Sequence, residues 1–179
     1  MNQHYPTWAQ HPLMKDYYDH YWGRPVYGEN ELFEWLCLEI FQAGLAWRQV
    51  WQRRAAFEAA FANFEIEAVA AFTTADVDRL QNDSGIIRNR AKIQACCHNA
   101  QLLAQWHQDG RYLSPVAWAV TGGEVLRLLP DQAGCLPATM PLATTFAKQL
   151  KAQGFQRTGP KTVFAWLCAV GIINGRLPE

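Results

Sequence analysis

A glutamate without a cationic neighbour lies in the segment LEIFQAGLAW, which runs from Leu38 to Trp47. At helical spacing no Lys or Arg stands three or four residues from Glu39 on either side, unlike the usual carboxylate of a solvated helix face. Its place on an apolar edge beside Trp47 leaves two interpretations. Glu39 is either a half-exposed residue at the helix margin, which is the commoner case, or a carboxylate that binds a ligand.

Aromatic side chains are concentrated ahead of this segment, at Trp8, Tyr17, Tyr18, Tyr21 and Trp22. Aromatic faces stack on nucleobases, and they attract a cationic base more strongly than a neutral one. The alternative is plain core packing, which is the more common role for most aromatic residues.

A third pattern lies between Leu80 and Ala95, in the segment LQNDSGIIRNRAKIQA. It predicts a helix, a tight turn at Gly85, and a second helix that begins among Arg88, Arg90 and Lys92. Such a turn presents free backbone N–H groups and the positive end of a helix dipole, which suit a phosphate group. An ordinary pair of helices with a solvated basic end is the alternative interpretation.

Composition limits the classes of protein that these patterns can serve. The chain has 179 residues, with 16 Lys and Arg against 16 Asp and Glu, so its formal net charge is zero. Half of the residues are hydrophobic, which excludes a disordered tail, and neutrality argues against global basicity but not against a local basic strip. Five Cys without a CxxC pair, no signal peptide and no membrane-spanning run predict a reduced, cytoplasmic protein.

The elements that must position these residues are predicted to be helices. Spacing and capping residues place them from Asn30, from about Trp47 to Ala62, after a capping box at Thr73–Asp76, from about Asn89 to Trp106, from Pro141 to Gln153, and from Pro160 to Gly171. No convincing strand pattern, internal repeat or linker interrupts them. We therefore expect an all-α protein with a single domain over residues 1–179.

The motifs occur in a fixed order along the chain: WxxxPL (8–13), DxxWG (19–23), LFExxCLExFQAGLxW (32–47) and SGIIRNRxKI (84–93). In this arrangement the chain resembles the DNA-3-methyladenine glycosylase I family, the Tag-type helix-hairpin-helix DNA glycosylases. The resemblance runs from Trp8 to Gly171. It implies two helical lobes with a base pocket between them, a helix-hairpin-helix element at about 76–106, and a monomer that acts on alkylated double-stranded DNA and releases free 3-methyladenine.

The resemblance also assigns roles to residues of this chain. It implies that Glu39 is the catalytic and base-binding glutamate and that Tyr17 and Trp47 line the pocket, with Trp8 and Trp22 as further walls. The DNA contacts that we expect are Gly44, Leu45, Gly85, Ile86, Ile87, Arg88, Arg90 and Lys92. N3-methylation makes adenine cationic, so the leaving group is already activated and strong acid catalysis is unnecessary. A carboxylate among π-faces would then favour the methylated base over adenine.

Two positions bear on the type of glycosylase. Related enzymes that cut the strand carry a nucleophilic lysine four residues after the first hairpin glycine, where this chain has Asn89. The general-base aspartate of the wider superfamily would fall near Asp109, but the pair Asp109-Gly110 is more typical of a turn. These positions favour a monofunctional hydrolase.

The clearest departure from the family concerns metal. The resemblance implies a structural zinc held by two Cys and two His near the two ends of the chain. Here Pro6 and Tyr18 occupy the N-terminal ligand positions, and no Cys or His follows Gly171. We therefore expect neither zinc nor another cofactor, with Tyr18 packing between the two ends instead.

Two other functions remain open. One is a non-catalytic DNA- or nucleobase-binding relative, against which the retention of Glu39 and Trp47 argues. The other is a glycosylase for a different alkylated base, since Met14 stands where many relatives have a tyrosine and Ala46 replaces a serine.

Overall fold

One helix, α2 (Glu29–Gln42), occupies the centre of the molecule and is buried along ten consecutive residues, 32–41. The computed structural model describes residues 5–132 and 134–177. A helix that is buried on all sides must be enclosed by other elements. The sequence placed its start at Asn30, whereas Gly28 is the N-cap; the Asn30 carboxamide instead accepts a hydrogen bond from Ile66 N–H at 3.1 Å.

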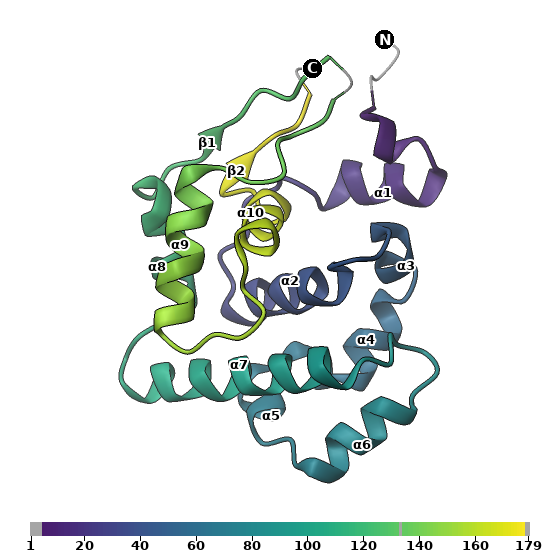
Figure 1. Cartoon of the computed structure of the whole chain (residues 1–179), viewed down its shortest axis with the longest axis vertical. Coiled ribbons are helices and arrows are strands. Elements are labelled where there is room, and N and C mark those ends of the chain that lie inside the picture. Colours follow the sequence, from purple (N-terminus) through teal and green to yellow (C-terminus); the bar gives the residue numbers. More distant parts are fainter. Residues whose placement is uncertain (1–4, 133, 178–179) are drawn as a thin grey trace.

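In Figure 1, α8 (Leu113–Trp118) and α9 (Pro141–Ala152) lie to the left of α2, and α1 (Pro12–His20) and α10 (Pro160–Ala169) lie above it. The last of them, α10, packs along α2, and its Trp166 indole donates to the Leu32 carbonyl at 3.0 Å. The helices expected from Pro141 and Pro160 are confirmed. Both begin with proline, whose missing N–H costs nothing in the first turn.

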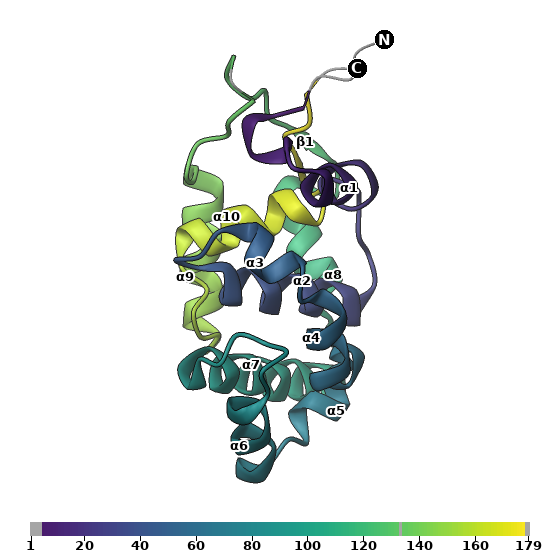
Figure 2. The ribbon, with the colours of Figure 1, turned by 90° about the vertical axis from the view of Figure 1, so that its right-hand side faces the viewer.

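The remaining helices follow α2 in the chain and continue into the lower part of the molecule (Figure 2): α3 (Trp47–Trp51), α4 (Arg54–Ala60), α5 (Ile66–Ala70), α6 (Thr74–Asn82) and α7 (Arg90–Gln108). The expectation of a single helix from Trp47 to Ala62 is wrong. The chain turns at Gln52 and Arg53, and α4 begins at Arg54, whose guanidinium packs back over the Trp35 and Trp51 rings. This packing of residues distant in sequence outweighs the local helical pattern.

The hairpin between α6 and α7 forms as its sequence predicts. Thr73 and Asp76 make the capping box of α6, and the Asp83 carboxylate accepts from Gly85 N–H at 2.7 Å to tighten the turn. The Asn89 side chain then caps α7 by accepting from Lys92 N–H at 3.1 Å. The 19-residue α7 passes beneath α2 in Figure 1 and joins the two parts of the molecule.

Strand structure is limited, within the described residues, to two parallel strands of two residues each, β1 (Leu126–Arg127) and β2 (Ile173–Asn174). No alternating pattern marks these strands in the sequence, because two residues are too few to show one. The fold is therefore helical with one short pairing near the C-terminus. None of the helices in the described part of the chain is long and apolar enough to cross a membrane.

The two ends of the chain meet through Tyr18 and Arg176. The Tyr18 hydroxyl accepts from Leu177 N–H at 2.9 Å, and the Arg176 guanidinium lies 4.3 Å from the centre of the Tyr18 ring. Arg176 also donates to the Tyr18 carbonyl and, at 2.8 Å, to that of Trp22. Pro6 and Tyr18 offer no zinc ligand, and the described residues contain no group of three His, Cys, Asp or Glu that could hold a metal. The residues at these positions do not fit the family's zinc.

We expect EDTA to leave the melting temperature unchanged, because hydrogen bonds and a cation–π contact join the N-terminal and C-terminal segments. Tyr18→Phe, in contrast, removes the acceptor of a backbone N–H and should lower the free energy of unfolding by about 1–3 kcal/mol. Thermal and urea unfolding, together with elemental analysis, measure both effects. One tightly bound zinc per chain would contradict this account of the ends.

Candidate active site

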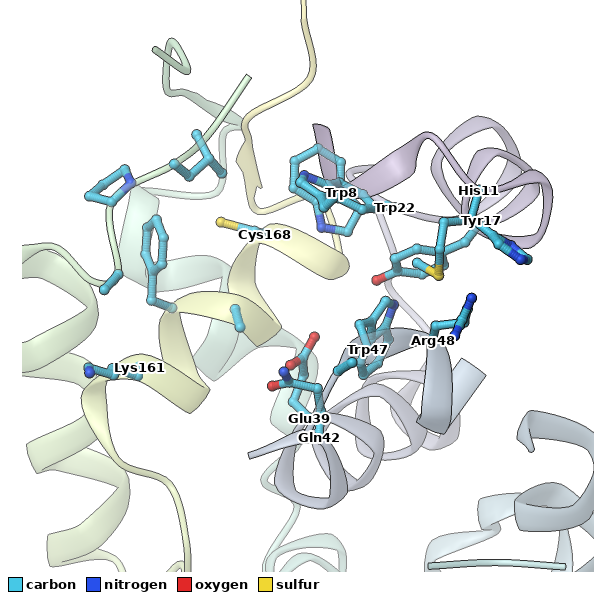
Figure 3. Close-up of a pocket in the computed structure, with 17 residues that line it drawn as sticks. Trp8, His11, Tyr17, Trp22, Glu39, Gln42, Trp47, Arg48, Lys161 and Cys168 are labelled. Carbon is cyan, nitrogen blue, oxygen red and sulfur yellow. The ribbon is translucent and has the colours of Figure 1, made fainter. Parts of the chain in front are cut away.

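A cavity of about 740 Å³ opens between α10 on one side and α1, α2 and α3 on the other (Figure 3). It is lined by all five residues expected in the base pocket: Trp8, Tyr17, Trp22, Glu39 and Trp47. These residues come from segments up to 39 positions apart in the sequence. The fold therefore brings the predicted carboxylate and the predicted aromatic rings to one place.

Glu39 reaches this cavity from the last full turn of α2, and Figure 3 shows its carboxylate directed into the space between the aromatic rings and α10. The residue is only 5% exposed, which excludes the half-exposed position at the helix margin. No cation of the described residues forms an ion pair with it. Burial raises its pKa from 4.5 to about 8, so the surrounding protein disfavours the ionised form.

The aromatic wall is made from three elements. Tyr17 of α1 is buried and lies 5.3 Å from the Trp47 ring, between centroids, and 6.1 Å from the Trp8 ring. Trp22 packs edge-on against Trp8 at 5.2 Å. Burial, followed by the nearby Glu39, raises the pKa of Tyr17 well above its usual value, so its hydroxyl stays protonated. Tyr18 joins the chain ends instead of lining the cavity.

A half-buried guanidinium, that of Arg54, stands behind this wall. Arg54 lies about 5 Å from the rings of Tyr21, Trp35 and Trp51, and it donates to Glu34 at 2.7 Å. Glu58 lies 3.1 Å from the same nitrogen. Two carboxylates thus balance the Arg54 charge, which limits its repulsion of a cation bound on the other side of the rings.

The loop after α2 is exposed beside the cavity. Gly44 has φ +84°, a conformation that favours glycine, and no atom lies within 4 Å of where its Cβ would be. The Gln42 side chain donates to the Leu45 carbonyl at 2.8 Å, while Leu45 N–H donates to the Gln42 carbonyl at 2.7 Å. Gly44 and Leu45 do not line the cavity. They form a braced tip next to it, as a residue that enters a duplex would require.

The hairpin residues divide into an exposed and a buried group. Arg88 and Arg90 are exposed, and Arg90 pairs with Asp78 at 2.8 Å. Gly85 and Ile87 are partly exposed in the turn, whereas Ile86 is buried and anchors it. These positions are compatible with phosphate contacts through the arginines and the backbone of the turn.

Lys92 does not fit its expected role as a surface contact with DNA. The residue is 6% exposed, and its ammonium donates to two backbone carbonyls, those of Phe41 and Ala43, each at 2.7 Å. Position 92 lies in the first turn of α7 and faces α2 instead of solvent. The partners of its ammonium are 51 and 49 residues away in the sequence, so the local pattern around Lys92 does not identify them.

Asp109 is exposed in the turn after α7, where Gly110 has φ +70°, and it does not line the cavity. Its interpretation as a turn residue is confirmed. Among the described residues that line the cavity, Glu39 is the only carboxylate.

Sequence reasoning missed a second group of lining residues: His11, Gln42, Arg48, Leu136, Pro137, Ala138, Lys161, Phe164, Ala165 and Cys168. Gln42 lies one helical turn after Glu39 in the same motif, so spacing could have identified it. Lys161 and Cys168 belong to α10, more than 110 residues beyond α2, and no local pattern points to them. Met14 and Ala46, the two departures from the family motifs, also line the cavity.

A helical protein with a cavity of aromatic rings around a single buried carboxylate is a binding protein for a flat, cationic or hydrogen-bonding group such as a nucleobase. Comparison with known proteins gives the family. A family model described as methyladenine glycosylase matches residues 8–179. The chain belongs to this family.

Individual relatives agree over nearly the whole chain. DNA-3-methyladenine glycosylase 1 of Escherichia coli (strain K12) is 34% identical over 166 residues, which cover 93% of this chain and 89% of that protein. A crystal structure of 3-methyladenine DNA glycosylase I superposes with a TM-score of 0.91 at 34% identity, covering 96% of this chain and 94% of the other. The Staphylococcus aureus enzyme gives 0.86 at 35% identity, with coverages of 92% and 88%.

The raised pKa of Glu39 predicts a pH-dependent stability. The folded protein keeps a proton that the unfolded chain releases above pH 4.5, so this stability is complete below pH 4.5 and is lost as the pH rises through about 8. Glu39→Gln does not titrate. Its free energy of unfolding should exceed that of the wild type by more than about 2 kcal/mol above this range and match it below.

Urea unfolding of both proteins at the two ends of the range measures this difference. Other titrating groups are common to the two proteins and cancel. Parallel pH profiles would mean that Glu39 is not desolvated in the folded protein.

Proposed function

We propose that this protein is a monofunctional DNA-3-methyladenine glycosylase, which hydrolyses the N-glycosidic bond of 3-methyladenine in alkylated DNA and releases the free base. The observation that carries the proposal is Glu39, which is buried in an aromatic cavity and forms no ion pair with any other residue that the structure describes. The Staphylococcus aureus relative, whose structure describes recognition of 3-methyladenine, supports the same substrate.

The cavity favours a cationic base because such a base lowers the free-energy cost of ionising Glu39. Ionisation by itself is unfavourable because the buried carboxylate has lost its hydration. A cationic base packed against the Tyr17 and Trp47 rings supplies the missing counter-charge, and the π-faces add attraction. Neutral adenine supplies neither, so it cannot offset the cost of the charged carboxylate.

The positive charge of the methylated base also activates it as a leaving group in hydrolysis of the N-glycosidic bond. The target nucleotide must leave the duplex stack to enter the cavity, and the Gly44–Leu45 tip is placed to fill the gap it leaves. The methylated base departs as a neutral molecule when water replaces it on the sugar, so no strong acid is needed. Asn89, in place of the strand-cutting lysine, fits hydrolysis without an amine nucleophile.

We also propose that the whole chain, 1–179, acts as one domain, as a monomer and in the cytoplasm. Its five cysteines include four that are buried as free thiols, which suits a reducing compartment.

Release of free bases from methylated duplex DNA, followed by chromatography, tests the proposal. We expect the wild type to release 3-methyladenine. Glu39→Gln should fold but release it roughly 100-fold more slowly, because a neutral amide lacks the negative charge that stabilises the bound cationic base and the positive charge that develops on the sugar as the base leaves. Glu124→Gln, on an exposed loop, is the matched control and should behave as wild type.

The other outcomes separate the alternatives. A folded wild type that binds methylated DNA and releases nothing would be a non-catalytic relative. Release of a different methylated base would trace to the altered cavity residues Met14 and Ala46.

Charge reversal at the hairpin tests DNA binding separately from the cavity. Arg88→Glu should weaken binding to damaged and undamaged duplex alike, since phosphate contacts carry no information on the base. Lys148→Glu, an exposed cation on α9, is the control. Fluorescence anisotropy at several salt concentrations measures the affinities, and weakening confined to the damaged duplex would place Arg88 at the cavity instead.

A further inference from the structure

Lys92 is a buried cation that the proposed chemistry does not use. It lies in the first turn of α7, and its ammonium donates at 2.7 Å to both Phe41 and Ala43 carbonyls. These carbonyls belong to the last turn of α2, where a helix leaves its C=O groups without intrahelical partners and carries the negative end of its dipole. The Lys92 ammonium supplies hydrogen-bond donors to these C=O groups and a positive charge at the negative end of the dipole.

The two carbonyls that Lys92 binds lie in the turn that connects Glu39 to the tip formed by Gly44 and Leu45. On one side, Ala43 N–H donates to the Glu39 carbonyl at 3.2 Å, so the Lys92 contact shares a turn with the cavity carboxylate. On the other side, Ala43 leads directly into the exposed tip at Gly44 and Leu45. Movement of this turn would displace Glu39 and the tip together.

The other end of the contact begins at the hairpin. Asn89 caps α7 by accepting from the backbone N–H of Lys92 itself, and Arg88 is exposed immediately before it. Figure 1 shows the start of α7 below the end of α2. Lys92 therefore makes two contacts. Its backbone N–H donates to the Asn89 cap at the start of α7, and its ammonium holds the turn of α2 that carries Glu39.

A direct phosphate contact is the alternative role, and the geometry opposes it. Two of the three ammonium protons are taken by carbonyls, and the side chain is buried. Burial first, and then the charge of Arg157, lowers the pKa of Lys92, which also describes a group shielded from solvent.

We propose that Lys92 is a positioning residue that fixes the turn of Glu39 and the Gly44–Leu45 tip relative to the DNA-binding hairpin. The duplex held at the hairpin then meets the tip and the cavity at a set distance. This inference rests on the proposed glycosylase function. It separates Lys92 from Arg88, which is exposed at the hairpin and is expected to bind phosphate without ordering the cavity.

The test compares Lys92→Met, Arg88→Met and the control Lys151→Met, an exposed lysine on α9. Duplex affinity is measured at several salt concentrations, and excision of 3-methyladenine is measured in single turnover with saturating enzyme. Lys92→Met should lower the saturated rate roughly 10- to 100-fold, the usual effect of misplaced groups, with the affinity and its salt dependence unchanged. Arg88→Met should weaken affinity and reduce the salt dependence by about one phosphate contact. Lys151→Met should change neither.

Lys92→Arg keeps a donor cation and should recover part of the rate lost in Lys92→Met. If Lys92→Met does not fold, Lys92→Arg carries the comparison, because its different reach shifts the turn and should lower the saturated rate at unchanged salt dependence.

A saturated rate equal to wild type in these variants would overturn the proposal. So would weaker binding with the shallower salt dependence of Arg88→Met, which would make Lys92 a phosphate contact. Absence of excision by the wild type itself would instead contradict the proposed function.

Discussion

Burial of α2 on all sides is the constraint on which the rest of the structure depends, and it places two carboxylates in the interior. Glu34 is 7% exposed and is paired with Arg54 at 2.7 Å. Glu39, five residues later, is 5% exposed, lines the cavity and forms no ion pair with any of the described residues. A buried charge requires a partner. The protein supplies one for Glu34, while Glu39 is left to be satisfied by what enters the cavity, which couples its ionisation to the charge of the ligand.

Closure of the chain ends serves the same site, because Trp8 and Trp22 stand next to the residues that join them. Arg176 and Tyr18 link the C-terminal segment to α1 through hydrogen bonds and a cation–π contact. A guanidinium can donate to several carbonyls at once, so Arg176 joins these segments through hydrogen bonds of fixed geometry. The aromatic wall therefore depends on side-chain packing at these ends.

The helical class, the hairpin and the grouping of Glu39 with the aromatic rings could be predicted from the sequence. The hairpin follows from local chemistry, since the cap at Thr73 and the turn at Gly85 involve residues within a few positions of each other. Glu39 could be singled out because helical spacing already showed that it lacks a local cation. The family motif then added the roles of Tyr17 and Trp47, which spacing alone left open between core and ligand contact.

Three features depend on contacts between residues that are distant in the sequence. They are the orientation of the Lys92 side chain toward α2, the break between α3 and α4, and the wall of the cavity that α10 forms. Lys92 bonds to a carbonyl 51 residues away, and Lys161 and Cys168 lie on a helix that meets α2 only after the chain has folded back. Local propensity carries no information about such distant partners. Their arrangement follows from burying α2 completely, which obliges α7 and α10 to pack against it and sets which of their side chains face the site.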